Sequence, residues 1–151
     1  MMKTITATLF FILLLANLTA CRTQRFHGHA SADNNLLLQG KQQAPTLYLL
    51  HNLTNQPLYL NHETGHGMSA GWASKIDSGK WSAFLVDKPH FSLICQTSTF
   101  KTITCKHHIA VLAQAIQPLT KQQIGTYWVA ENQAYTALLS EIKKRKIKRL
   151  L

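Results

Sequence analysis

Short apolar and aromatic runs separated by turn-forming residues recur along the chain from about residue 46, and this pattern constrains the fold more than any other feature. Runs of this length that are rich in Leu, Val, Ile, Tyr, Phe and Trp are typical of β-strands, and their regular spacing favours a sandwich or a barrel. The runs are Thr46–His51, Pro57–Asn61, Trp72–Ile76, Lys80–Val86, Phe91–Cys95, Ile103–Cys105, His107–Ala113 and Thr126–Ala130. We therefore expect a mainly β fold, a single antiparallel β-sandwich or barrel-like domain of about seven strands.

Two turn segments predict hairpins. Asn52–Gln56 separates two copies of the sequence Leu-Tyr-Leu, which favours pairing of the strands on either side. Asp77–Gly79 is a turn signal before Lys80–Val86 and predicts a second hairpin with Trp72–Ile76.

The apolar period changes near the C-terminus. Tyr135, Leu138, Leu139 and Ile142 recur at helical spacing, and Asn132 precedes them as a candidate N-cap. One amphipathic α-helix is therefore expected to close the domain.

The chain has three cysteines, and two of them suit a disulfide. Cys95 and Cys105 end two predicted strands that are joined by the polar connection Gln96–Thr99. If they lie opposite each other, they reach disulfide geometry and the bond stabilises the fold by roughly 2 to 3 kcal/mol. Two buried thiols are the alternative. The third cysteine, Cys21, has a different role.

The N-terminus predicts export and lipidation. A positive start is followed by the apolar run Ala7–Leu15, which has the length of a secretory signal and is too short for a spanning helix. Leu18-Thr19-Ala20-Cys21 then matches a bacterial lipobox, in which Cys21 is lipid-modified and becomes the mature N-terminus. An ordinary cleaved signal with Cys21 close to the cut is the alternative. By resemblance to known lipoproteins, Arg22 after the cysteine indicates the outer membrane, with the domain facing the periplasm or the surface.

The chain then divides into a lipoprotein signal peptide at residues 1–20, a flexible tether at residues 21–44, and a β-rich domain with a basic C-terminal helix at residues 45–151. The tether is polar with few apolar residues. Leu36–Leu38 interrupts it and is either a short turn or a strand that docks on the domain.

The chain is strongly basic. It has 16 Lys and Arg against 6 Asp and Glu, a net charge of +10, and only Lys3 of these lies in the signal peptide. Such a charge favours anionic partners, and nucleic acid is not expected as a partner of an exported protein. Six cations lie together near the end of the sequence: Lys143, Lys144, Arg145, Lys146, Lys148 and Arg149. They are either a solvated helix end that the helix dipole stabilises or a contact for an anionic surface.

His62-Glu63-Thr64-Gly65-His66 matches the HExxH motif of zinc peptidases. That chemistry requires a helix, because only helical spacing puts both imidazoles on one face. Gly65 and Gly67 make this stretch a poor helix former, so a glycine-rich surface loop is the expected structure and no metal is assigned. A zinc site using His62 and His66 remains the alternative.

Several segments resemble a known family. Asn55–His62, Ser69–Ala83, Gly125–Asn132 and the paired cysteines are similar to the enhanced-entry protein B family, small exported proteins of intracellular bacterial pathogens. The resemblance covers about residues 45–147. It implies a role in entry into host cells and transfers no active-site residue.

The leading functional hypothesis is a lipid-anchored envelope protein with a non-enzymatic binding or structural role and no cofactor. Its expected partners are the membrane, through lipid on Cys21, and an envelope or host protein. Two alternatives remain: a zinc-dependent hydrolase that uses His62, Glu63 and His66, and a periplasmic inhibitor or lysozyme-binding module.

Overall fold

The computed structural model describes residues 35–62, 73–117 and 120–148, and these residues form nine strands and one α-helix. The strands are β1 (Asn35–Leu38), β2 (Thr46–Asn52), β3 (Leu58–His62), β4 (Ala73–Ile76), β5 (Trp81–Val86), β6 (Phe91–Gln96), β7 (Thr102–Ile103), β8 (Ile109–Ala115) and β9 (Tyr127–Gln133). The α-helix is α2 (Tyr135–Lys144), and two short 3-10 helices, η1 (Cys105–His107) and η2 (Lys121–Gln123), lie in connections. Within the described ranges, no helix is long and apolar enough to span a membrane.

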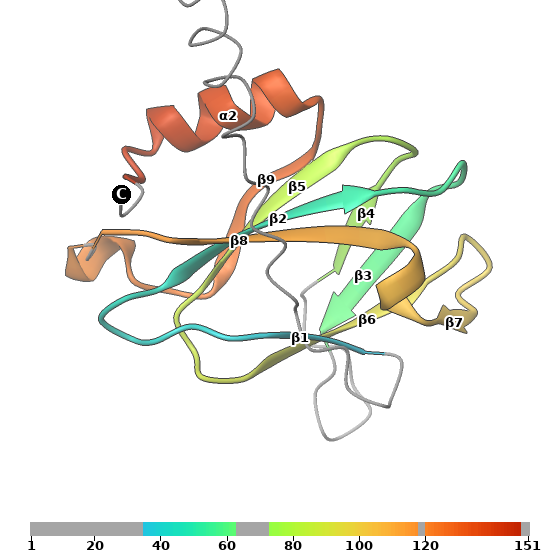
Figure 1. Ribbon diagram of the computed structural model, residues 1–151, viewed down its shortest axis with the longest axis horizontal. Helices are drawn as coiled ribbons and strands as arrows, with labels where there is room; N and C mark the ends of the chain where they lie inside the picture. Colours follow the sequence, from blue (N-terminus) through green and yellow to red (C-terminus); the bar gives the residue numbers. More distant parts are fainter. Residues whose placement is uncertain (1–34, 63–72, 118–119, 149–151) are drawn as a thin grey trace, which may run out of the picture.

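The strands form two antiparallel sheets that pack as a sandwich. The first sheet has the order β1-β6-β3-β4, and β7 pairs with β6; the second has the order β8-β2-β5-β9. Figure 1 shows α2 above the second sheet, with the first sheet on the opposite side of it. The predicted mainly β fold with one C-terminal helix is confirmed, and its architecture is the sandwich.

Two apolar layers hold this arrangement together. Leu50 of β2 and Phe84 of β5 point between the sheets, whereas Leu49 and Leu85 on the same strands point toward α2. The first sheet adds to the inner layer Leu36, Leu38, Leu58, Leu60, Ile76, Phe91, Leu93 and Cys95. Because the second sheet lies between the other sheet and the helix, β2 and β5 are apolar on both faces.

Neither predicted hairpin forms. β2 pairs with β5 and β8, whereas β3 pairs with β4 and β6, so the connection after Asn52 crosses from one sheet to the other. β4 and β5 also belong to different sheets. The two strands that share Leu-Tyr-Leu differ in burial. β2 is buried on both faces, whereas in β3 buried and partly exposed side chains alternate, because only Leu58 and Leu60 face the core. A turn signal does not distinguish a return within one sheet from a crossing to the facing sheet.

The folded domain includes residues that were expected to belong to the tether. Asn35–Leu38 is a strand, the second of the two alternatives for this region, and it pairs with Phe91–Ile94 of β6. Gly40 then packs so closely on the β5–β6 connection that an added Cβ would lie 1.8 Å from the carbonyl oxygen of Val86. The boundary expected at residue 45 is therefore replaced by one at or before Asn35.

The start of α2 also differs from the prediction. Asn132 is not the N-cap: it lies within β9 in a left-handed conformation with φ of 50°, and Ala134 caps the helix without a side-chain hydrogen bond. The side chain of Asn132 instead bonds to Asp77, accepting from its backbone N–H at 2.8 Å and donating to its carboxylate at 2.7 Å. This pair joins the edge strands β4 and β9 of the two sheets.

One end of the sandwich collects several connections, and we call it the loop end. It consists of residues 53–57, 77–80, 97–101 and 104–108, together with the start of α2, where the Tyr135 ring lies 4.8 Å from that of Trp81. The first strand starts on this side, because Asn35 pairs with Ile94 near the end of β6 and Leu38 pairs with Phe91 at its start. In Figure 1 the loop end is on the right.

Candidate functional site: a basic surface and an apolar loop end

The described C-terminal cations are all exposed, at the end of α2 and directly after it. The basic surface consists of Lys143, Lys144, Arg145, Lys146 and Lys148, all of which are exposed. Lys143 and Lys144 lie in the last turn of α2, where the helix dipole favours positive charge. The sixth predicted cation, Arg149, lies outside the described residues.

The chain reversal after α2 creates this surface. Lys146 has a φ of 55°, its N–H donates to Lys143 O at 3.0 Å, and Ile147 N–H donates to Ile142 O at 3.4 Å. This is a Schellman motif, in which glycine usually takes the position of Lys146. Ile142 and Ile147 are buried beneath it, so the apolar side chains hold the segment down and the lysines point outward.

The basic surface includes a shallow groove. A hollow of about 460 Å³ is lined by Leu139, Ile142, Lys143, Lys146, Ile147 and Lys148. Its lining is mostly apolar and combines three aliphatic residues with three lysines. Such a groove suits a ligand that carries negative charge beside apolar groups.

Two acidic residues lie beside this surface, Glu131 and Glu141, which line one hollow with Lys144 and Arg145. Glu141 lies 3.3 Å from Arg145 Nε and 3.7 Å from Lys144 Nζ, both as surface ion pairs. Pairs this exposed contribute little to stability, so their main effect is on local charge. Burial raises the pKa of Tyr127, and the positive charge of Arg145 acts in the opposite direction.

The basic surface and the loop end lie at opposite ends of the sandwich. Tyr135 at the start of α2 contacts Trp81, whose strand partner is His51 near the end of β2. Beyond the other end of the helix, Lys148 accepts a 2.9 Å hydrogen bond from Gln117, just after the strand β8 that pairs with the start of β2.

Only His62 of the HExxH motif lies in the described residues. It ends β3, its Nδ1 lies 2.9 Å from Ser92 O, and its ring stacks on Phe91 with a centroid distance of 4.1 Å. A strand conformation at His62 does not provide the helical face that the zinc peptidase mechanism uses. Glu63 and His66 lie outside the described ranges, and within those ranges no three His, Cys, Asp or Glu side chains gather in a metal-binding cluster.

Cys95 and Cys105 form a disulfide with a Cα–Cα distance of 5.3 Å. The prediction that Cys105 ends a strand is wrong: Ile103 is opposite Cys95, and Cys105 begins η1. The strand expected from His107 starts instead at Ile109, because η1 occupies residues 105–107. The disulfide therefore ties the β6–β7 hairpin to the 3-10 turn that follows it. The predicted lipidation site, Cys21, lies outside the described residues.

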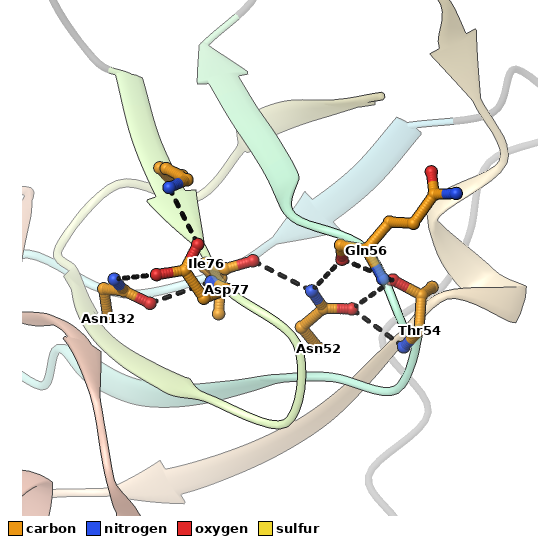
Figure 2. Close-up of polar contacts among 7 residues, drawn as sticks. Asn52, Thr54, Gln56, Ile76, Asp77 and Asn132 are labelled. Carbon is orange, nitrogen blue, oxygen red and sulfur yellow. Dashed lines mark hydrogen bonds and ion pairs between the residues drawn. The ribbon is translucent and has the colours of Figure 1, made fainter. Parts of the chain in front are cut away.

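A buried polar network organises the loop end (Figure 2). Asn52 is fully buried, and its Nδ2 donates to Gln56 O at 2.7 Å and to Ile76 O at 2.8 Å. Its Oδ1 accepts from Thr54 N–H at 2.8 Å. One side chain thereby fixes the β2–β3 connection and joins it to the end of β4. Figure 2 shows that the Asp77–Asn132 pair lies beside this network.

The loop end also exposes large hydrophobic side chains, which sequence reasoning missed. Leu53 is 57% exposed, Phe100 67% and Tyr135 41%, and among the described residues these are the exposed large hydrophobic ones. They come from two connections and from the first residue of α2, so no local pattern marks them as a group. The one local signal is Phe100, an aromatic residue directly after a polar turn.

Comparisons of the chain with protein-family models, with curated proteins and with solved structures gave no match.

Proposed function

We propose that the protein is an exported, lipid-anchored envelope protein with a non-enzymatic binding or structural role. The observation that carries this proposal is the lipobox Leu18–Cys21 behind a short apolar run. Two further features support it. The Cys95–Cys105 disulfide suits an oxidising compartment such as the periplasm. About 14 residues separate Cys21 from the first strand, a segment that reaches at most about 50 Å and keeps the domain close to the membrane.

The basic surface is the binding surface in this proposal, and its partner is an anionic component of the envelope. Its five exposed cations outnumber the two nearby acids, Glu131 and Glu141, and the groove lined by Lys143, Lys146 and Lys148 adds apolar contacts. A hydrolase would instead need His62 on one helical face with His66, and His62 stands at the end of a strand. This favours binding over zinc chemistry.

The resemblance to the enhanced-entry protein B family extends the proposal to the host. A surface protein of this kind would support entry into host cells by contacting an envelope or host component. Comparing host-cell invasion by bacteria that carry the native chain with invasion by a deletion strain tests that step; equal invasion by the two strains would remove the host role.

Anchoring is tested by replacing the modified residue. Native protein should sediment with outer-membrane vesicles, and Cys21→Ser should abolish incorporation of labelled fatty acid and remove the protein from that fraction. Fatty-acid incorporation that persists in Cys21→Ser would contradict the proposal.

The binding role is tested by charge reversal with a matched control. The test variant replaces Lys143, Lys144 and Lys146 by Glu; the control replaces the exposed residues Lys41, Lys88 and Lys121 by Glu. Both variants change the net charge equally. We expect co-sedimentation with isolated cell-wall polymer to fall at least about tenfold for the test variant and much less for the control. Equal losses would show a nonspecific charge effect and contradict a site at the basic surface.

A further inference from the structure

We infer that the loop end docks on the surface of the lipid bilayer, so that the basic surface points away from the membrane. This inference rests on the proposed lipid anchor and adds an orientation to it. The occupant of the loop end is a membrane surface with anionic headgroups, and Leu53 and Phe100 are the side chains that enter its interface.

The distribution of exposed hydrophobic side chains is the first argument. Leu53, Phe100 and Tyr135 come from the β2–β3 connection, the β6–β7 connection and the start of α2, and all three are at the loop end. Among the described residues no large hydrophobic side chain is comparably exposed at the opposite end. Isolated exposed hydrophobic residues are ordinary, but their collection at one end marks an interaction surface.

Phe100 provides the second argument, because a bulky aromatic residue occupies a backbone conformation that favours glycine. Its φ is 59°, in the left-handed region that a bulky side chain rarely occupies. The turn is closed by hydrogen bonds from Phe100 N–H to Thr97 O at 2.9 Å and from Thr97 N–H to Lys101 O at 3.0 Å. Glycine would fit this position without strain, and the Phe100 ring is two-thirds exposed. Strain of this kind is typical of a functional position.

The hairpin that carries Phe100 is held rigidly. The disulfide joins Cys95 at its base to Cys105, and the Tyr59 ring supports Phe100 from the sheet with a centroid distance of 5.7 Å. A fixed loop loses little conformational entropy when its tip is buried in a partner. The structure therefore presents the aromatic ring in advance of contact.

Charge at the loop end fits an anionic bilayer. Lys80, Lys101 and Lys106 are exposed in its connections. The carboxylate of Asp77, in the connection between β4 and β5, already forms an ion pair with Lys75 at 2.8 Å and accepts a hydrogen bond from Asn132. Lysines beside apolar tips are attracted to anionic headgroups while the hydrophobic side chains enter the interface.

The attachment point of the anchor is the third argument. The chain from Cys21 enters the domain at Asn35, on the side of β1 that faces the loop end and next to β7. An acylated Cys21 would thus draw this end toward the bilayer. The helix α2 runs from the loop end to the opposite end (Figure 1), so its basic surface would face the aqueous envelope.

Photo-crosslinking in the full-length lipidated protein tests the orientation. p-Benzoylphenylalanine replaces Phe100 or Leu53 in two samples and the exposed Lys88 or Lys121, which lie outside the basic surface, in two controls, each in vesicles that contain anionic phospholipid. We expect phospholipid adducts at the loop-end positions to exceed those at the control positions by at least about tenfold. Equal yields at all four positions, or adducts to protein alone at position 100, would overturn the inference.

A variant removes the docking side chains and leaves the anchor in place. With the crosslinker at Lys101, Leu53→Ser combined with Phe100→Ser should lower lipid adducts at least about tenfold, whereas Ser98→Ala with Thr99→Ala should leave them unchanged. Phe100→Gly with Leu53→Ser keeps the turn geometry and should behave like the serine pair, which separates docking from folding. Unchanged adducts in these variants would refute docking.

The mass of the N-terminal peptide separates this inference from the proposed anchor. Acylated Cys21 without adducts at position 100 would refute docking and leave the anchor standing. Adducts at position 100 with an unmodified Cys21 would refute the anchor and leave docking standing.

Discussion

Replacing Asn52 by alanine should destabilise the domain strongly, although the residue lies at the end of a strand. The side chain is fully buried and makes three hydrogen bonds to backbone groups, those of Thr54, Gln56 and Ile76. Each bond contributes about 0.5 to 1.5 kcal/mol. The carbonyl of Ile76 lies in a buried setting and would lose a partner, which adds about 1 to 3 kcal/mol, so we expect a total loss of roughly 2.5 to 7.5 kcal/mol.

Urea unfolding of the chain that starts at Arg22, with its disulfide intact, measures this loss. The midpoint should fall while the slope of the free energy with urea stays constant, because the surface exposed on unfolding does not change. Asn61→Ala is the matched control, since Asn61 is half-buried on the outer face of the first sheet and bonds only to the Gln96 side chain among the described contacts of its amide. Asn61→Ala should lower the free energy of unfolding by about 1 kcal/mol or less. A loss below about 1 kcal/mol for Asn52→Ala would refute the view that this network organises the loop end.

Three further predictions follow from single features of the sandwich. Phe100→Gly should leave the free energy of unfolding unchanged or raise it by up to about 1 kcal/mol, because it relieves a left-handed conformation; a clear loss in urea unfolding would contradict this. Replacing Cys95 and Cys105 together by alanine should lower the free energy of unfolding by about 2 to 3 kcal/mol, read as a lower thermal midpoint that reducing agent no longer changes. The hydrogen bond from Lys75 holds the pKa of the Asp77 carboxyl below its usual value, and the hydrogen bond from Asn132 adds to the effect. The ionised carboxylate therefore stabilises the fold above a pH of about 4, and this stabilisation is lost as the pH falls through the lowered pKa. The stability difference between the native protein and Asp77→Asn, measured by urea unfolding from pH 7 to pH 2, should therefore shrink only below about pH 4; a difference that is constant across this range would count against the ion pair.

The positions of the strands were predictable because each strand is a short apolar run between turn-forming residues. Which strands pair with each other was not predictable. β2 is buried between the first sheet and α2, so Leu47 and Leu49 are as apolar as Leu50 and the period-2 signal disappears. Nothing local to Asn52–Gln56 shows that the chain crosses to the other sheet. The burial of the second face of β2 depends on α2, which lies more than 80 residues later in the chain.

The basic surface and the loop end also differ in how far the sequence predicts them. The basic surface was predictable because its cations are contiguous in sequence. The loop end was not, because only the topology of both sheets places Leu53, Phe100 and Tyr135 at the same end of the domain. Asn132 shows the same limit: its type and position suit an N-cap, but a contact with Asp77, distant in sequence, determines its role.

The mass of the mature protein extracted from bacterial membranes tests the central claim most directly. The account predicts a polypeptide that begins at Cys21 and carries acyl chains on that residue, with a mass that fits an intact Cys95–Cys105 bond. A mature protein that starts elsewhere, or that carries a free Cys21 thiol and is recovered from the soluble fraction, would contradict it.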